Sequence, residues 1–180
     1  MLLFLVFIVG LFIGSFLNVL ADRFSRNESP VKGRSHCEKC KKNLKWFDLI
    51  PLVSFIILKG RCRYCHIRLS LYYPIVELTT GVMFVLIFLF VGIMNHELRI
   101  MDLGYYLFVV SGLIIVFFAD LKYGIIPDKI IFPAILVSGL YLFIIHNSLF
   151  IIHLWSALGA GLFFLALFLG TKGKGMGFGD

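Results

Sequence analysis

The sequence predicts an all-α polytopic membrane protein, with about five transmembrane helices and one small cysteine-containing domain outside the membrane. Of its 180 residues, 60% are hydrophobic and only 15% are charged. A soluble domain needs more charge than this on its surface, so the composition excludes an ordinary soluble protein. The five apolar stretches are each long enough to cross a bilayer. All four cysteines lie in one polar segment, which predicts the additional domain.

The five predicted spans lie at about residues 1–20, 74–94, 103–119, 130–145 and 154–170. The first has no basic residue ahead of it and no good cleavage site behind it, so we interpret it as a retained span and not as a secretory signal. It contains Gly10 and Gly14, a spacing of small residues that lets another helix pack closely.

The distribution of positive charge predicts the orientation. Of the 17 Lys and Arg residues, 12 lie between residues 22 and 68, directly after the first span. With the N-terminus outside, 16 basic residues face the cytoplasm and only Arg99 faces outward. The net charge of +7 therefore indicates contact with the lipid bilayer and not with nucleic acid. This orientation predicts that residues 21–73 form a cytoplasmic domain and that residues 74–180 form a membrane domain.

The cytoplasmic domain carries Cys37, Cys40, Cys62 and Cys65 in the pattern C-x2-C-x21-C-x2-C. Two such pairs can offer four thiolates to one tetrahedral zinc ion, which would close a domain that has little core of its own. A redox-active pair or unligated thiols are the alternatives. Lasting disulfides are disfavoured in the cytosol, so the spacing favours structural zinc.

Two acids at membrane edges are the candidate catalytic residues. Asp120 ends an apolar run, and Asp180 closes the string Gly173-Lys-Gly-Met-Gly-Phe-Gly179. An ionisable group beside hydrocarbon is costly, which favours a functional role with a partner. Two carboxylates held together share a proton, so one can activate water while the other protonates a leaving group. We predict that Asp120 and Asp180 form this pair, and that Gly177 and Gly179 let a substrate backbone come close.

Both acids could instead have no catalytic role, and Asp128 is an alternative to Asp120 as the catalytic partner of Asp180. Asp120 could be a loop acid beside Lys122, and a glycine-rich tail could be a flexible end. Asp128 follows Pro127 and opens the fourth span, where an aspartate caps free amides. Asp120 instead ends the third span, where the helix dipole repels an anion and apolar neighbours desolvate it. A charge in that place favours Asp120 as the functional acid.

Several further motifs occur in a characteristic order. They are Gly14-Ser-Phe-Leu-Asn-Val19, Trp46-Phe-Asp-Leu-Ile-Pro-Leu52, Gly60-Arg-Cys-Arg-Tyr-Cys65, Tyr73-Pro-Ile-Val-Glu77 and Ile126-Pro127-Asp128. With the Gly-x-Gly-Asp string, they make the sequence resemble the GxGD intramembrane aspartyl peptidases, and in particular the type IV prepilin peptidases. The resemblance implies a bacterial inner-membrane endopeptidase that cleaves the short basic leader of prepilins or pseudopilins at the cytoplasmic face. The family's first catalytic aspartate matches Asp120.

The resemblance also implies a second activity, S-adenosylmethionine-dependent methylation of the new pilin N-terminus. In this family the cytoplasmic loop and the adjoining span are associated with that reaction, which makes Glu77 a candidate residue. The competing interpretation is that Glu77, in the first turn of the second span, only satisfies the helix dipole.

Family members continue past the motif aspartate through a lysine-rich turn into further spans, typically eight in all, so we expect this chain to be truncated at Asp180. Two other function classes remain. One is a membrane thiol-disulfide oxidoreductase that uses the Cys-x-x-Cys pairs. The other is a non-catalytic membrane zinc module or inactive fragment.

Overall fold

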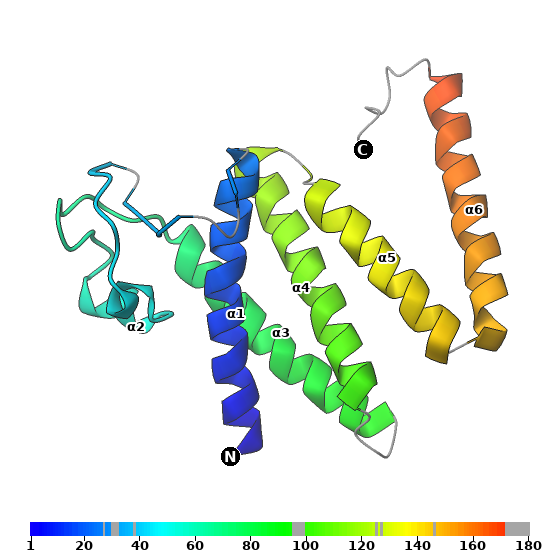
Figure 1. The fold of residues 1–180 in the computed structure, drawn as a ribbon, viewed down its shortest axis with the longest axis horizontal. Coiled ribbons are helices and arrows are strands. Elements are labelled where there is room, and N and C mark those ends of the chain that lie inside the picture. Colours follow the sequence, from blue (N-terminus) through cyan, green and yellow to red (C-terminus); the bar gives the residue numbers. More distant parts are fainter. Residues whose placement is uncertain are drawn as a thin grey trace. The chain divides into compact units, whose positions relative to one another are not determined.

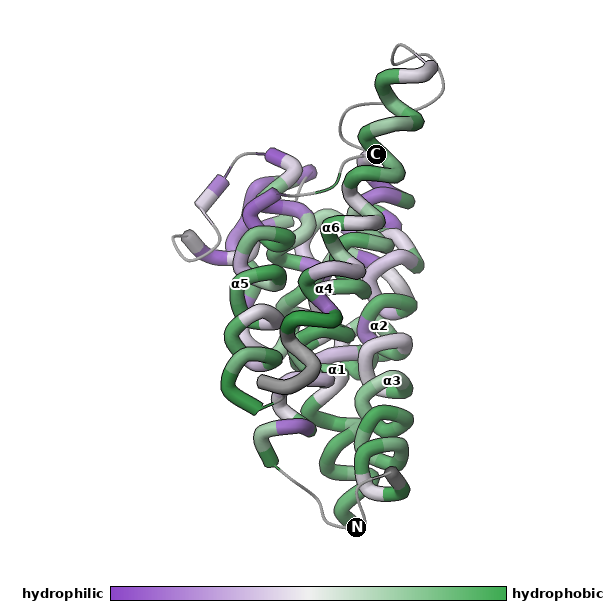
Figure 2. The backbone as a smooth tube through the Cα atoms, turned by 90° about the vertical axis from the view of Figure 1, so that its right-hand side faces the viewer, coloured by the Kyte–Doolittle hydropathy of each residue, from purple (hydrophilic) through white to green (hydrophobic). Residues whose placement is uncertain are grey.

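The computed structural model describes residues 1–26, 28–29, 33–37, 39–94, 100–124, 126, 128–145 and 147–171. Five long helices dominate this part of the chain, and all five are long and apolar enough to cross a membrane. Figure 2 shows them coloured mainly as hydrophobic. The predicted helical fold with five spans is confirmed. In chain order, the elements of Figure 1 are α1 (Leu2–Ser25), η1 (Trp46–Leu49, a 3-10 helix), α2 (Val53–Ile57), α3 (Tyr72–Met94), α4 (Ile100–Tyr123), α5 (Asp128–Ile145) and α6 (Asn147–Gly170).

The helices extend beyond the apolar stretches that predicted them. α1 continues to Ser25 instead of ending near residue 20, and α4 continues to Tyr123 instead of ending at residue 119. Hydropathy marks only the segment suited to hydrocarbon, whereas helical hydrogen bonding continues through the polar residues that follow. Asp120 therefore lies in the last turn of α4, and the interpretation of Asp120 as a loop acid is wrong. The helix ends at Tyr123 and is followed by Gly124, whose φ is +62° and whose N–H donates to the Asp120 carbonyl at 2.8 Å.

The chain divides into two units, Met1–Ile131 and Phe132–Asp180. The first contains α1 to α4 with the loop between α1 and α3. The second contains most of α5 and all of α6. In α5 none of the described residues is buried. Its large apolar side chains are suited to contact with lipid.

α1 and α3 run antiparallel with their backbones in close contact. A Cβ atom on Gly10 would lie 2.7 Å from Gly81 Cα, and one on Gly14 would lie 2.8 Å from Glu77 Cα. Real Cβ atoms do not approach the backbone so closely, so both positions require glycine for this packing. The close approach predicted from the Gly10 and Gly14 spacing is confirmed.

α4 completes a three-helix core at the end where α1 stops and α3 starts, which we call the loop-side end. Tyr72 of α3 packs edge-on against Phe118 of α4, with ring centroids 5.7 Å apart. The Tyr72 hydroxyl also donates to the Phe118 carbonyl at 3.1 Å. Seven buried apolar residues form this core: Leu17, Ala21, Val76, Ile114, Ile115, Phe118 and Ala119. The core fixes the loop-side end, and with it the last turn of α4.

Candidate functional site

The four cysteines lie on two turns with matching hydrogen bonds. In the first, the Cys37 N–H donates to the Lys42 carbonyl at 3.0 Å, and in the second the Cys62 N–H donates to the Ile67 carbonyl at 2.9 Å. One antiparallel β-bridge closes each turn. Each turn presents its two thiols on the same side, as two zinc knuckles do.

The four sulfur atoms are gathered into one cluster. All lie within 4.8 Å of one another, and Cys37 Sγ is 3.8 Å from Cys65 Sγ. Tetrahedral zinc with Zn–S bonds of about 2.3 Å places its sulfur ligands about 3.8 Å apart. Cys37 and Cys62 are buried, Cys40 and Cys65 are half-buried, and none of the four forms a disulfide. The donor set and its spacing fit a zinc ion.

The surroundings of Cys65 oppose ionisation of its thiol when no cation is present. A backbone hydrogen bond from Ile67 acts to lower the pKa of Cys65. Desolvation and hydrogen bonds with the other three thiols outweigh it and raise the pKa to about 11. Four thiolates within 4.8 Å of one another would repel each other, so this spacing suits a metal cation bound between them.

Asp48 joins η1 to the second knuckle, a link that the sequence analysis missed. Its Oδ1 accepts from Arg63 Nε at 2.7 Å, and its Oδ2 accepts from the Lys45 N–H at 3.1 Å. The Asp48 side chain is only 2% exposed. The Arg63 guanidinium also lies 4.8 Å from the centroid of the Phe47 ring. The only local sequence signal was an aspartate three residues after Lys45, at the start of a short helix.

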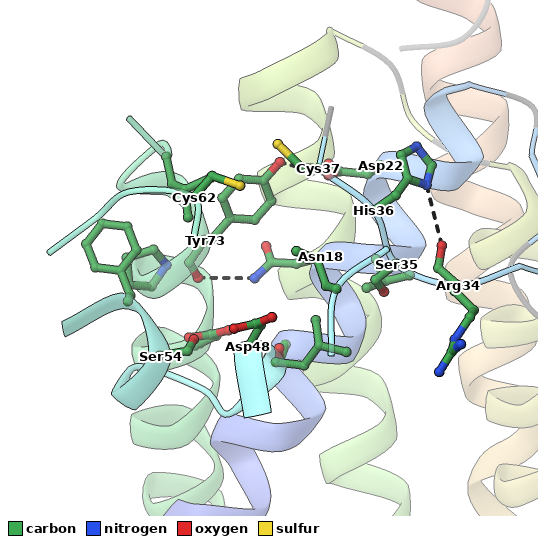
Figure 3. Close-up of a pocket in the computed structure, with 18 of the residues that line it drawn as sticks. Asn18, Asp22, Arg34, Ser35, His36, Cys37, Asp48, Ser54, Cys62 and Tyr73 are labelled. Atoms are coloured by element: carbon green, nitrogen blue, oxygen red, sulfur yellow. Dashed lines mark hydrogen bonds between the residues drawn. The ribbon is translucent and has the colours of Figure 1, made fainter. Parts of the chain in front are cut away.

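A cavity of about 210 Å³ lies between the loop-side ends of α1 and α3 and the cysteine domain (Figure 3). On α1, the cavity is lined by Arg23 near the helix end and by four residues that follow the helical repeat and so share one face of the helix. Those residues are Ser15, Asn18, Val19 and Asp22. α3 and the cysteine domain supply the other walls, which include Tyr73, Glu77, Cys37, Phe55, Leu58 and Cys62.

Glu77 lies on the wall of this cavity and does not occupy the first turn of its helix. α3 begins at Tyr72, so Glu77 is in the second turn, where the dipole has little effect. The side chain is buried, and Oε2 accepts from the Leu52 N–H at 2.8 Å. Leu52 has φ +58°, a rare conformation for a non-glycine residue. Glu77 therefore holds the apolar part of the loop against α3, and the helix-dipole interpretation is wrong.

Asp120 is the only member of the predicted catalytic pair that the structure describes. It is exposed, although its neighbours Phe118 and Ala119 are buried. Each residue turns a helix by about 100°, so the face of Ala119 points to the core and that of Asp120 points away. The burial expected for Asp120 from its apolar neighbours is therefore not found. The other predicted residues, Asp180, Gly177 and Gly179, lie outside the described residues.

A polar cluster close to Asp120 was not predicted. Asp22 Oδ1 accepts from Lys122 Nζ at 2.8 Å and from the Tyr123 hydroxyl at 2.6 Å. Asp22 Oδ2 accepts from the Tyr73 hydroxyl at 3.0 Å. The Lys122 ammonium also lies 4.5 Å from the centroid of the Tyr72 ring. This Asp22–Lys122 cluster joins α1, α3 and α4, and its members lie too far apart in the sequence for any local pattern to reveal it.

The fold and the sulfur cluster define a multi-pass membrane protein with a four-cysteine domain between its first two spans. The sequence model of the Bacterial Peptidase A24 N-terminal domain matches residues 8–91, and that of the Type IV leader peptidase family matches residues 107–180. A prepilin leader peptidase/N-methyltransferase from Bacillus subtilis is 33% identical, over 99% of this chain and 69% of that protein. The chain belongs to the type IV leader peptidase family.

Two further relatives carry the same name. The protein from Myxococcus xanthus is 37% identical, over 73% of this chain and 38% of its own length. The protein from Vibrio cholerae is 31% identical, over 74% of this chain and 54% of its own length. The chain thus matches between 38% and 69% of the length of these three relatives. No solved structure matches the chain.

Proposed function

We propose that this chain belongs to a membrane aspartyl endopeptidase that removes the short basic leader from type IV prepilins or pseudopilins. The observation that carries this proposal is the match of the type IV leader peptidase family to residues 107–180, a segment that includes both Asp120 and Asp180. The shared name of the relatives supports a prepilin as the substrate. In this assignment, residues 21–73 form the cysteine domain and residues 74–180 form the peptidase part.

The proposed mechanism divides the chemistry between two carboxyl groups. Asp180 takes a proton from the water that attacks the scissile carbonyl, and Asp120 protonates the departing amine. The acid role is assigned to Asp120 because the carbonyl end of α4 disfavours a further negative charge. Gly177 and Gly179 leave space for the substrate backbone beside Asp180. Their lack of a side chain supports an extended substrate bound close to the chain.

The proposed orientation has the N-terminus outside and the cleavage site at the cytoplasmic face of the bacterial inner membrane. It is supported by the charge distribution, which places 16 basic residues in the cytoplasm and only Arg99 outside. In this orientation, Asp120 and the cysteine loop lie on the same side of the membrane. A basic leader retained in the cytoplasm would reach that side.

The cysteine domain has a structural role in this proposal. Zinc, bound by the thiolates of Cys37, Cys40, Cys62 and Cys65, would hold the two knuckles together. The close sulfur spacing and the absence of disulfides among the four cysteines support this role over thiol-disulfide exchange.

Methylation of the new N-terminus is a second proposed activity, favoured by the position of Glu77 on the cavity wall and by the names of the relatives. S-adenosylmethionine would supply the methyl group. The loop between α1 and α3 contains only Gly33 and Gly60, which are too far apart for a glycine-rich cofactor loop. We therefore propose that Glu77 contacts the substrate of this reaction, and we assign no residue to cofactor binding.

Substitution of the two acids tests the peptidase proposal in the protein expressed from its complete gene. Asp120→Asn and Asp180→Asn should each lower the rate of prepilin leader cleavage by about 10²-fold or more, because Asn cannot exchange a proton. The matched control is Asp128→Asn, which should still cleave because Asn also serves at a helix start. The measurement is leader release from a prepilin in membranes. Loss of cleavage in Asp128→Asn together with retention in Asp120→Asn would refute the assignment.

A further inference from the structure

Asn18 lines the cavity between α1, α3 and the cysteine domain, and it carries a buried, unsatisfied acceptor. The residue is 4% exposed, and its Nδ2 donates to the Tyr73 carbonyl at 3.1 Å (Figure 3). A carbonyl only accepts, so this bond fixes the orientation of the amide and leaves Oδ1 free. Asn18 Oδ1 has no hydrogen-bond partner among the described residues. Such buried acceptors are rare in proteins, and this one points to a ligand that donates.

Glu77 supplies a second acceptor to the same cavity. Its Oε2 accepts from the Leu52 N–H, and the Ser15 side chain is a second hydrogen-bond partner of the carboxylate. A carboxylate has about four acceptor positions in total, so further positions are open. Glu77 is buried, and it lies one helical turn further into α3 than Tyr73, the partner of Asn18. Asn18 and Glu77 line the same cavity, so both acceptors are offered to a ligand with several N–H donors.

The other charged groups of the cavity are already paired or lie at its rim. Asp22 is bound by Lys122, and Asp48 by Arg63. The Arg23 guanidinium donates to backbone carbonyls. The remaining charged residues are exposed: Arg26, Glu28 and Arg34. The two buried acceptors, Asn18 Oδ1 and the Glu77 carboxylate, therefore suit a ligand that donates hydrogen bonds, and a positively charged donor suits the Glu77 carboxylate.

The size of the cavity restricts the ligand further. A volume of about 210 Å³ lies below the roughly 300–1,000 Å³ of pockets that enclose a drug-sized ligand. Apolar side chains, including Val19, Phe55 and Leu58, form much of the wall. The cavity thus suits an amino group attached to one apolar residue, and it is too small to enclose a nucleoside cofactor as well.

We propose that this cavity binds the α-amino group and first side chain of the cleaved substrate polypeptide, with Asn18 Oδ1 and the Glu77 carboxylate as acceptors. The inference rests on the proposed methyl transfer, which needs the new N-terminus to be held in place. The cysteine domain then acts as one wall of a substrate site, in addition to its structural role.

Binding of two peptides to the complete protein in lipid nanodiscs tests the proposal. One peptide begins with a free α-amino group on an apolar residue, and its twin is Nα-acetylated. The wild-type protein should bind the free peptide at least about tenfold more tightly, since acetylation removes the charge and two donors. Asn18→Leu and Glu77→Gln should reduce this preference. Asn18→Asp should keep it, because Asp retains the acceptor while losing the amide donor to Tyr73.

Phe16→Leu is the matched control, because Phe16 lies on the exposed side of α1, with 53% of its surface accessible. It should bind both peptides as the wild-type protein does. Equal binding of the two peptides by the wild-type protein would overturn the proposal, and this arm does not depend on any variant folding. The proposal would also be overturned if Asn18→Leu weakened binding of S-adenosylmethionine and left the peptide preference intact. A preserved preference without any methyl transfer would support the cavity assignment and refute the proposed methylation.

Discussion

At the scale of single residues, Lys122 is paired with a distant acid and not with Asp120. The two residues are separated by two positions in α4, so their side chains leave the helix on nearly opposite sides. Lys122 Nζ binds Asp22 Oδ1 instead, and the ammonium lies over three tyrosine rings. Lys122 is close to Asp120 in the sequence, but its charge links α4 to α1 through Asp22. Asp120 remains exposed at a fixed helix end.

The Asp22–Lys122 pair should contribute measurably to stability. Its side chains are 17% and 24% exposed, so the pair is less screened by solvent than a surface salt bridge. We expect Asp22→Asn and Lys122→Met each to lower the free energy of unfolding by about 1–3 kcal/mol. The double variant should lose clearly less than the sum of the single losses, with a coupling of about 1 kcal/mol or more.

Denaturant unfolding in mild detergent measures these free energies. Thr171→Ala is a suitable control, because Thr171 is exposed and its hydroxyl donates to the Leu167 and Phe168 carbonyls in the last turn of α6. Strictly additive losses for Asp22→Asn and Lys122→Met would show that the two side chains do not interact.

At the scale of elements, the sequence predicted those features that depend on local pattern. Hydropathy located all five spans, and the cysteine spacing predicted the sulfur cluster. Each knuckle has one residue with a left-handed backbone after its second cysteine: Lys41 with φ 57° and His66 with φ 55°. The sequence did not predict these conformations, because neither residue is glycine. The contacts of Asp48 and Glu77 were also missed, since each joins segments whose proximity depends on the fold. Glu77 and Leu52 are 25 positions apart.

Removal of metal should loosen the cysteine domain and leave the helices folded. The domain has little apolar core beyond its sulfur cluster, and structural zinc supplies about 10–16 kcal/mol of apparent binding energy in small zinc domains. Protein purified under reducing conditions should contain one zinc ion, and a chelator should make the segment between Arg34 and Arg68 sensitive to trypsin. The helical circular dichroism signal should change little.

Cys62→Ser should reproduce the effect of the chelator, and the exposed Ser70→Ala should not. Protein with all four thiols reduced but no bound zinc, together with trypsin resistance unaffected by chelation, would contradict a structural metal site.

At the scale of the whole molecule, the two candidate sites lie at one end of a helical core. α1, α3 and α4 share the packed core, and this core carries both the cavity beside the cysteine domain and the last turn of α4 with Asp120. From the positions of the basic residues, the sequence predicts that both sites face the cytoplasm. It could not predict the cavity, whose walls combine three segments far apart in the chain. The pairing of Asp120 with Asp180 remains a prediction from the sequence and the family.

The orientation is the last prediction, and it applies to the whole chain. With the N-terminus outside, the start of α4 faces the exterior and the segment before α3 faces the cytoplasm. We choose Ile100, which is 83% exposed, and Ser70, which is also exposed, as sites for single added cysteines. In intact cells, Ile100→Cys should react with a membrane-impermeant maleimide, while Ser70→Cys should react only after permeabilisation.

The unmodified protein is the control for the four native thiols. Labelling of Ser70→Cys but not Ile100→Cys in intact cells would reverse the topology, and would place Asp120 on the side of the membrane away from a cytoplasmic leader.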